Sequence, residues 1–148
     1  MAMKKLLIAL LLAALLIPSA LAADEYDYDA WILAPDDWIG EEITVRGTIA
    51  NVLETPVDDE PGQVVDEVFI ELNDDVGMLA VFPYQRDEQS APMSIYVDGK
   101  IHYRGVFQGL TFYKTEVGLY LALPVIERVP DSQITAMPPG RELPAPLR

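Results

Sequence analysis

The sequence predicts an all-β fold, either a small barrel or a sandwich, and three observations support this. Five segments between Ile43 and Val129 have the alternating or continuous apolar character of strands. Turn-forming residues separate these segments. No amphipathic helix of ordinary length occurs anywhere in the chain, so helices cannot form a layer of the fold.

The first 22 residues have the three parts of a secretory signal. Residues 4–5 are lysines, residues 6–17 are an unbroken apolar run, and residues 20–22 give the small-x-small pattern that signal peptidase cleaves. A membrane-spanning helix needs ~20 apolar residues, and this run is shorter and ends at a proline. We therefore expect cleavage near Ala22, a periplasmic or secreted bacterial protein, and no membrane span in the mature chain.

The composition is strongly acidic. The 148 residues include 24 Asp and Glu against 10 Lys and Arg, for a net charge of −14. The leader removes two lysines and no acid, so the mature charge is −16. There is no cysteine, which excludes a disulfide framework, a cysteine-ligated metal site and a thiol nucleophile. The remaining length suits one domain.

The mature chain begins with an acidic segment, residues 23–37, whose first residues we expect to be mobile. A short helical turn is expected near Pro35, because proline suits the first helical position and acids follow it. The apolar residues around this turn could cap one end of a sheet; they are Trp31, Ile32, Trp38 and Ile39.

The strands follow in order, joined by loops. The five predicted strands cover residues 43–53, 67–72, 78–82, 100–107 and 119–129. Pro83 is expected to end the third strand, and Asp98-Gly99 signals a tight turn before the fourth. Gln108 to Gly118 is interpreted as a turn or hairpin tip. The proline-rich tail, residues 130–148, is expected to be disordered.

Three stretches carry a resemblance to a known fold. Trp38 to Ile49 is similar to the hydrophobic-Gly-x-x-Val-x-Val-x-Gly-x-Val first strand of OB-folds. Asp98 to Val106 resembles their Gly-Asp-x-Val-x-Val-x-Gly fourth strand, and Gly118 to Val129 resembles their last strand. Residues 38–129 thus resemble the nucleic-acid-binding-like OB superfamily, which includes small exported bacterial proteins. The resemblance implies a five-stranded Greek-key barrel.

Two glycines are placed where such a fold needs them. Gly47 and Gly105 lie inside the first and fourth predicted strands. A small barrel closes only if its long strands bend sharply, and glycine permits that bend.

The sequence has no arrangement typical of an enzyme, and no cofactor is expected. His102 is the only histidine, is expected to face outward with Arg104, and has no second histidine or cysteine to act with. No serine lies in a Gly-x-Ser-x-Gly elbow. Calcium is an alternative, since it takes oxygen ligands from loops. The acids proposed for it lie between the first two strands; they are Asp58, Asp59, Glu60 and Asp66.

We therefore expect a non-catalytic binding module for a protein, peptide or glycan. The resemblance implies a ligand surface on the second and third strands and their flanking loops. The candidate residues there are Phe69, Phe82, Tyr84, Phe112, Tyr113 and Lys114. Single-stranded nucleic acid is the alternative ligand, through Arg46, Arg86 and Arg104, although the negative charge of the chain opposes phosphate binding.

Overall fold

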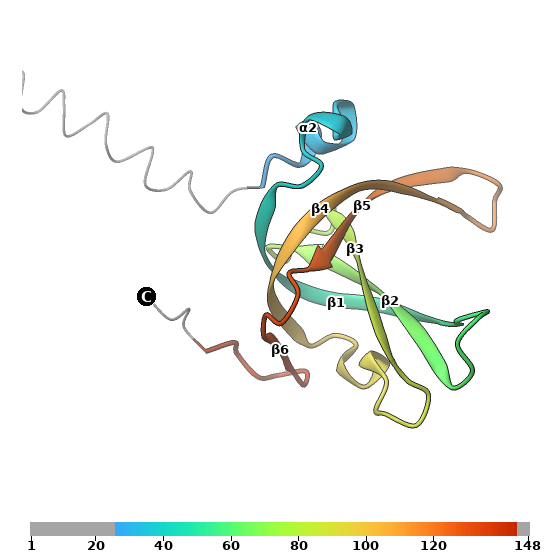
Figure 1. Ribbon diagram of the computed structural model, residues 1–148. Helices are drawn as coiled ribbons and strands as arrows, with labels where there is room; N and C mark the ends of the chain where they lie inside the picture. The colour runs from blue at the N-terminus through green and yellow to red at the C-terminus, as the bar shows by residue number, and fades with distance from the viewer. Residues whose placement is uncertain (1–25, 145–148) are drawn as a thin grey trace, which may run out of the picture.

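The computed structural model describes residues 26–144 (Figure 1). The expected signal peptide, residues 1–22, lies outside the described part. The helical elements are α2 (Tyr28–Leu33) and the 3-10 turns η1 (Pro35–Asp37) and η2 (Met93–Tyr96). The strands are β1 (Glu42–Pro56), β2 (Gln63–Leu72), β3 (Leu79–Asp87), β4 (Lys100–Lys114), β5 (Tyr120–Arg128) and β6 (Ile134–Met137). The expectation of a mostly β chain is confirmed.

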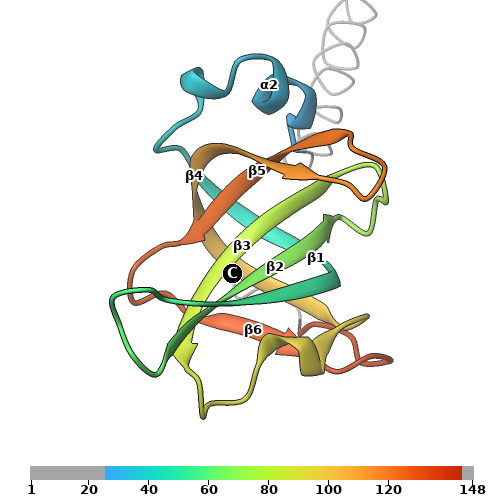
Figure 2. The same ribbon diagram turned by 90° about the vertical axis from the view of Figure 1, so that its right-hand side faces the viewer.

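The strands form one sheet that closes on itself. Their order is β1-β2-β3-β5-β4-β6, and β1 also pairs with β4, so the first five strands make a ring of hydrogen bonds (Figures 1 and 2). Every pairing is antiparallel except β3 with β5, which is parallel and has one registered pair, Val81 with Val125. With one registered pair, this is the shortest strand pairing in the ring.

Gly47 and Gly105 lie where a neighbouring strand leaves no room for a side chain. A Cβ atom on Gly47 would lie 2.1 Å from the carbonyl oxygen of Glu71, and one on Gly105 would lie 2.4 Å from Cγ2 of Ile126. Neither distance is possible for a real side chain. Both glycines are therefore required by space, at positions where β1 and β4 each pass from one partner strand to the next.

The interior of the ring is filled by alternate residues of every long strand. Tyr103 of β4 stacks on Phe82 of β3 with ring centres 4.3 Å apart, and its hydroxyl donates to the carbonyl of Ile126 over 2.6 Å. The buried phenol is thus satisfied, as a buried polar group must be. Val45 and Ile49 of β1 are fully buried, which confirms the period-two pattern of the first predicted strand.

The segment before β1 covers one end of the ring (Figure 2). Trp31 is 2% exposed and packs on Phe107 and Trp38, with ring centres 5.6 and 6.5 Å away. Tyr28 donates to the carbonyl of Leu79 over 2.7 Å, and Tyr26 to that of Thr44 over 2.9 Å. The expectation of an apolar cap is confirmed for Trp31 and Trp38, whereas Ile39 is 54% exposed. The expectation of mobility is wrong for residues 26–30, because the acids alternate with tyrosines that anchor the segment.

Four strands run further than their sequence suggests: β1 ends at Pro56, β2 begins at Gln63, and β3 and β4 are extended at their C-terminal ends. β4 continues to Lys114, so the predicted turn from Gln108 to Gly118 is wrong for its first seven residues. Gly109, at φ +113°, forms part of a β-bulge opposite β5, and β4 continues beyond it. β3 continues through Pro83 to Asp87. Beyond Val81 no described strand pairs with the second edge of β3, so a proline there removes no ladder bond on that side.

The proline-rich tail contains a strand, which corrects the expectation of disorder for its described part. β6 pairs with Lys100 to Tyr103 of β4. β5 begins its pairing with β4 only at Gly105, so the preceding edge of β4 is open. β6, which starts with the β-prone residues Ile134 and Thr135, fills it.

Candidate ligand-binding surface

The hairpin formed by the end of β4 and the start of β5 projects from the ring (Figure 1). We call residues 110–124 the β4–β5 arm. Its strands pair with each other, with Phe112 opposite Ala122, Tyr113 opposite Leu121 and Lys114 opposite Tyr120. Because β3 meets β5 only at Val125, no described strand pairs with the outer edge of β5 from Tyr120 to Pro124.

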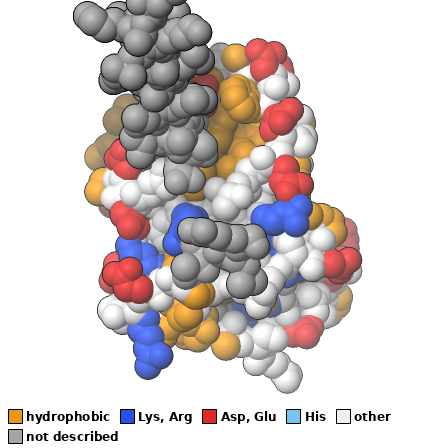
Figure 3. Space-filling model, turned by 90° about the vertical axis from the view of Figure 1, so that its left-hand side faces the viewer, with side chains coloured by type: hydrophobic (Ala, Val, Ile, Leu, Met, Phe, Trp, Pro, Cys, Tyr) orange, Lys and Arg blue, Asp and Glu red, His pale blue; other side chains and the backbone are white. Residues whose placement is uncertain are grey.

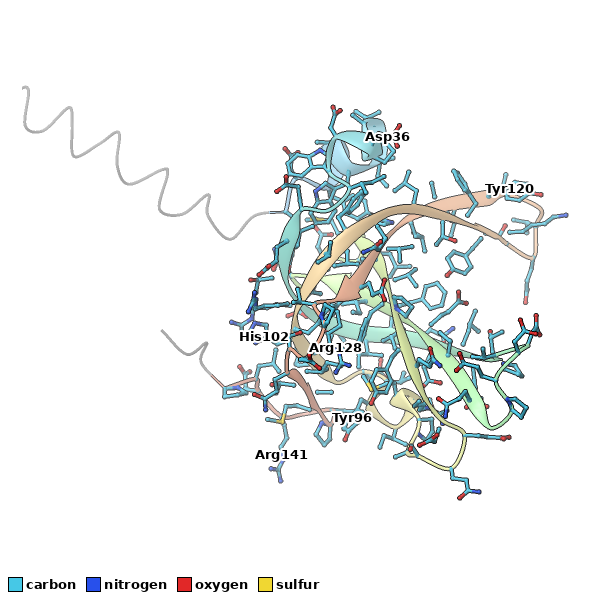
Figure 4. All side chains as sticks on the ribbon, viewed as in Figure 1. Asp36, Tyr96, His102, Tyr120, Arg128 and Arg141 are labelled. Atoms are coloured by element: carbon cyan, nitrogen blue, oxygen red, sulfur yellow. The ribbon has the colours of Figure 1, made fainter. Side chains whose placement is uncertain are left out.

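The arm concentrates exposed apolar side chains. It carries five of the ten large hydrophobic residues that are exposed in the described chain. They are Phe112 (66%), Val117 (81%), Leu119 (66%), Tyr120 (68%) and Leu121 (47%). Figure 4 shows Tyr120 near the end of the arm, away from the ring. Scattered apolar residues are ordinary on a surface, but a contiguous group of them is typical of an interaction site.

Tyr113 fastens the arm to the outer surface of β2 and β3. Its ring meets Phe69 edge-on, with centres 5.0 Å apart, and its hydroxyl donates to Oε1 of Glu67 over 3.1 Å. Burial, and then the negative charge of Glu67, raise the pKa of Tyr113 above its ordinary value, so the phenol stays a donor. Leu121 faces Tyr113 across the hairpin and shares its side of the arm.

A small apolar cluster lies beneath Tyr113, outside the main core. Phe69, Val81 and Leu123 form it, and Leu79 and Tyr113 pack against it. These residues alternate with core residues along β2, β3 and β5, so they lie on the outer surface of those strands. The cluster gives that surface an apolar floor next to the exposed arm.

The charged residues on this outer surface are all acidic. We call it the acidic face; its charged members are Glu67, Glu71, Asp87 and Glu127. The basic residues of β2, β3 and β5 are Arg86 and Arg128, and alternation places both on the opposite side. None of the four acids forms an ion pair within residues 26–144.

The structure separates the aromatic residues that the sequence grouped together. Phe82 is fully buried, and Tyr84 lies on the same core-facing side of β3, with ring centres 5.9 Å apart. These two residues therefore do not contribute to the acidic face, while Phe69 and Tyr113 do. Phe112 and Lys114 are exposed, on the side of the arm opposite Tyr113, and in β4 rather than at a loop tip.

The predicted group of three arginines is not formed. Arg86 is buried beside Asp66, whereas Arg46 and Arg104 lie on the outer side of β1 and β4. Their neighbours there are Lys100 and His102, which were not among the predicted nucleic-acid contacts. Figure 3 shows this side, with Lys and Arg among Asp and Glu.

We call these four residues, Arg46, Lys100, His102 and Arg104, the basic face. Lys100 pairs with Asp74 over 2.7 Å, and Nε of Arg104 donates to Glu42 over 2.8 Å. Partial burial and then the charge of Arg46 lower the pKa of His102. His102 lies outward on β4, as expected, on the opposite side of the molecule from Tyr120 in Figure 4.

A shallow cavity of about 270 Å³ opens at one end of the basic face. Its charged lining is mixed and includes Arg46, Lys100, Asp74 and Glu142. Since both signs are present, the cavity shows no preference for an anion.

The acids proposed for calcium are not brought together. Asp66 is a fully buried residue of β2, while Asp58, Asp59 and Glu60 are exposed in the loop between β1 and β2. Across residues 26–144, no three His, Cys, Asp or Glu side chains form a group that could hold a metal ion. The expectation of this four-residue cluster is therefore wrong.

The sequence analysis missed Glu67 and the exposed apolar residues from Val117 to Leu121. Their signal was the apolar run Gly-Leu-Tyr-Leu, which was interpreted only as the start of a strand. This run is exposed because β5 extends beyond the ring there, which only the strand pairing shows.

Comparison with protein-family models, curated proteins and solved structures gives no match to the chain. No helix within residues 26–144 is long and apolar enough to cross a membrane.

Proposed function

We propose that this chain is an exported OB-type barrel that acts as a non-catalytic module and binds an extended segment of a protein or peptide at the β4–β5 arm. The closed ring, with β1 pairing to β4 and β3 meeting β5 in parallel, supports the barrel. The single observation that carries the function is the arm, which combines exposed apolar side chains with an unpaired strand edge.

The unpaired edge favours a polypeptide ligand. A strand with one free edge offers a row of backbone donors and acceptors, and an added peptide strand satisfies them. Leu121 and Tyr113 lie on one side of this edge, and Phe112 and Tyr120 on the other, so alternate side chains of an added strand find apolar contacts on both sides. A glycan has no backbone that would use the edge, so we favour a peptide over a glycan.

The arrangement supports nucleic acid less well. Single strands bind where aromatic rings and cationic groups line the same groove. Here the exposed aromatic residues lie on the arm, while Arg46, Lys100 and Arg104 lie on the basic face, and two of those three are paired with acids.

Peptide selection by phage display, followed by anisotropy titration of the enriched peptides, tests the function. We expect Leu121→Thr to weaken binding at least ~10-fold. Truncating a side chain that anchors the centre of an interface lowers the binding free energy by over ~1 kcal/mol. Ile95→Thr is the matched control, because Ile95 is 55% exposed on η2 and lies outside the arm. Equal binding by wild type and Leu121→Thr, or no enriched peptide at all, would contradict the proposal.

Export is tested separately. Expression of the full chain in a Gram-negative host, followed by mass analysis of the periplasmic fraction, should give a protein that begins at Ala23. Recovery of only the uncleaved chain, in the cytoplasm or the membrane, would exclude this part of the proposal.

A further inference from the structure

From the distribution of charge we infer that the bound segment is cationic, with Lys or Arg among apolar residues. This inference rests on the proposed function and narrows it to a class of partner. The acidic face has four carboxylates and no Lys or Arg, and one of them, Glu67, contacts the arm through the Tyr113 hydroxyl.

Three carboxylates elsewhere on the described surface form ion pairs. Asp74 pairs with Lys100, Glu42 with Arg104, and Glu54 with Arg86. The acids of the acidic face have no such cation. Where β1 pairs with β4, the Lys and Arg residues lie instead on the outward side of those two strands, in the basic face.

Glu67 is the acid best placed to bind a positively charged side chain. It is part-buried beside Phe69, where a charge interaction is screened less than on an open surface. One of its oxygens already accepts the Tyr113 hydroxyl, which fixes the carboxylate next to the arm. An incoming Lys or Arg whose apolar neighbours contact Leu121 and Tyr113 brings its charge to the remaining lone pairs.

The net charge of the chain also disfavours a second copy as the partner. Another copy would bring a net charge of −14 or, after loss of the leader, −16 toward the same face. A cationic segment instead gains from that field at long range, which speeds association and makes it dependent on salt.

The test uses three end-blocked peptides that share one set of apolar residues and carry Lys, Gln or Glu at the intervening positions. Calorimetry should show binding of the Lys peptide, weaker binding of the Gln peptide and none of the Glu peptide. Added sodium chloride should weaken the Lys peptide most. Glu67→Gln should weaken the Lys peptide about two- to five-fold, as expected for one partly exposed ion pair. Asp36→Asn, which removes the same charge on η1, is the control and should leave the affinity unchanged.

The outcomes separate this inference from the proposed function. Equal binding of the Lys and Gln peptides, both lost in Leu121→Thr, would overturn the cationic preference and keep the peptide site. A Glu67→Gln variant that binds the Lys peptide like wild type would also overturn it. Failure of all three peptides to bind would count against the proposed function itself. Sedimentation showing dimers that dissociate in Leu121→Thr would assign the arm to self-association and overturn the inference.

Discussion

The Nε atom of Arg86 donates a hydrogen bond to Oδ2 of Asp66 over 2.7 Å, and both side chains are almost completely buried. Arg86 also donates to the carbonyls of Asp87 and Ser90, at 3.1 Å each, and Asp66 accepts from the backbone N–H of Met93 over 2.9 Å. The pair thus ties neighbouring strands β2 and β3 to the loop that leads into η2. Its role is structural, which explains why Arg86 takes no part in a surface.

The first prediction concerns this pair. Asp66→Ala should lower the free energy of unfolding by about 3–5 kcal/mol, because it removes the buried carboxylate beside the Arg86 guanidinium and leaves the half-exposed Glu54 as its carboxylate partner. Urea denaturation followed by circular dichroism measures the loss. Asp59→Ala, in the exposed loop between β1 and β2, is the control and should shift the midpoint little.

Replacing both partners distinguishes charge burial from packing. Asp66→Leu combined with Arg86→Met should be more stable than Asp66→Leu alone, since the double variant no longer buries a guanidinium without Asp66 and leaves only the half-exposed Glu54 unpaired. A double variant that is no more stable than the single one would show that the network acts mainly through the loop carbonyls.

The second prediction concerns Gly47. Gly47→Ala should destabilise the protein by at least about 1–3 kcal/mol, the usual cost of overpacking, since the new methyl group would meet a backbone oxygen that cannot move aside. Gly77→Ala is the matched control, because its nearest atom is a side-chain oxygen of Asp75 at 3.3 Å. Similar unfolding midpoints for the two variants would show that β1 and β2 do not cross as closely as described.

The third prediction tests the sixth strand. A Cβ on Gly99 would lie 2.0 Å from the carbonyl oxygen of Met137, so Gly99→Ala should push β6 away from β4. Hydrogen exchange of the β6 amides, Ile134 to Met137, should then become faster, while amides of the β4–β5 pairing stay protected. Unchanged exchange in β6 would argue that the tail does not pair with β4.

The fourth prediction follows from the lowered pKa of His102. A folded-state pKa below the unfolded value of 6.5 means that the unfolded chain binds the proton more readily. The stabilising contribution is therefore complete above pH 6.5 and is lost as pH falls through the folded-state pKa. His102→Gln should have a flatter stability profile than wild type across this window. Parallel profiles for the two proteins would show that burial and the charge of Arg46 do not lower the pKa of His102.

The sequence predicted the strand content well because its signals are local. Alternation along β1 and β2 reports burial directly, and Gly47 and Gly105 were identified from their place in the pattern. Strand ends were predicted less well. Pro83 lies within β3 because its outer edge is unpaired, and Gly109 permits a bulge instead of ending β4, and both facts depend on the neighbouring strands.

The candidate site was predicted only in part, for a related reason. Phe69 and Phe82 are both aromatic residues of adjacent strands, and only the register shows that one faces outward and the other inward. Likewise, Arg86 and Arg46 are the same type of residue, but only the structure shows that Arg86 is paired with Asp66, twenty residues away on the neighbouring strand. Residue type alone does not separate a ligand-facing side chain from one that holds the fold together.

The most direct test of the account is backbone amide NMR of the mature chain during titration with the Lys peptide. We predict that chemical-shift changes centre on Glu67, Phe69, Tyr113 and Leu121, where the arm meets the acidic face. Changes centred on Arg46, Lys100 and His102, with the arm unaffected, would contradict it.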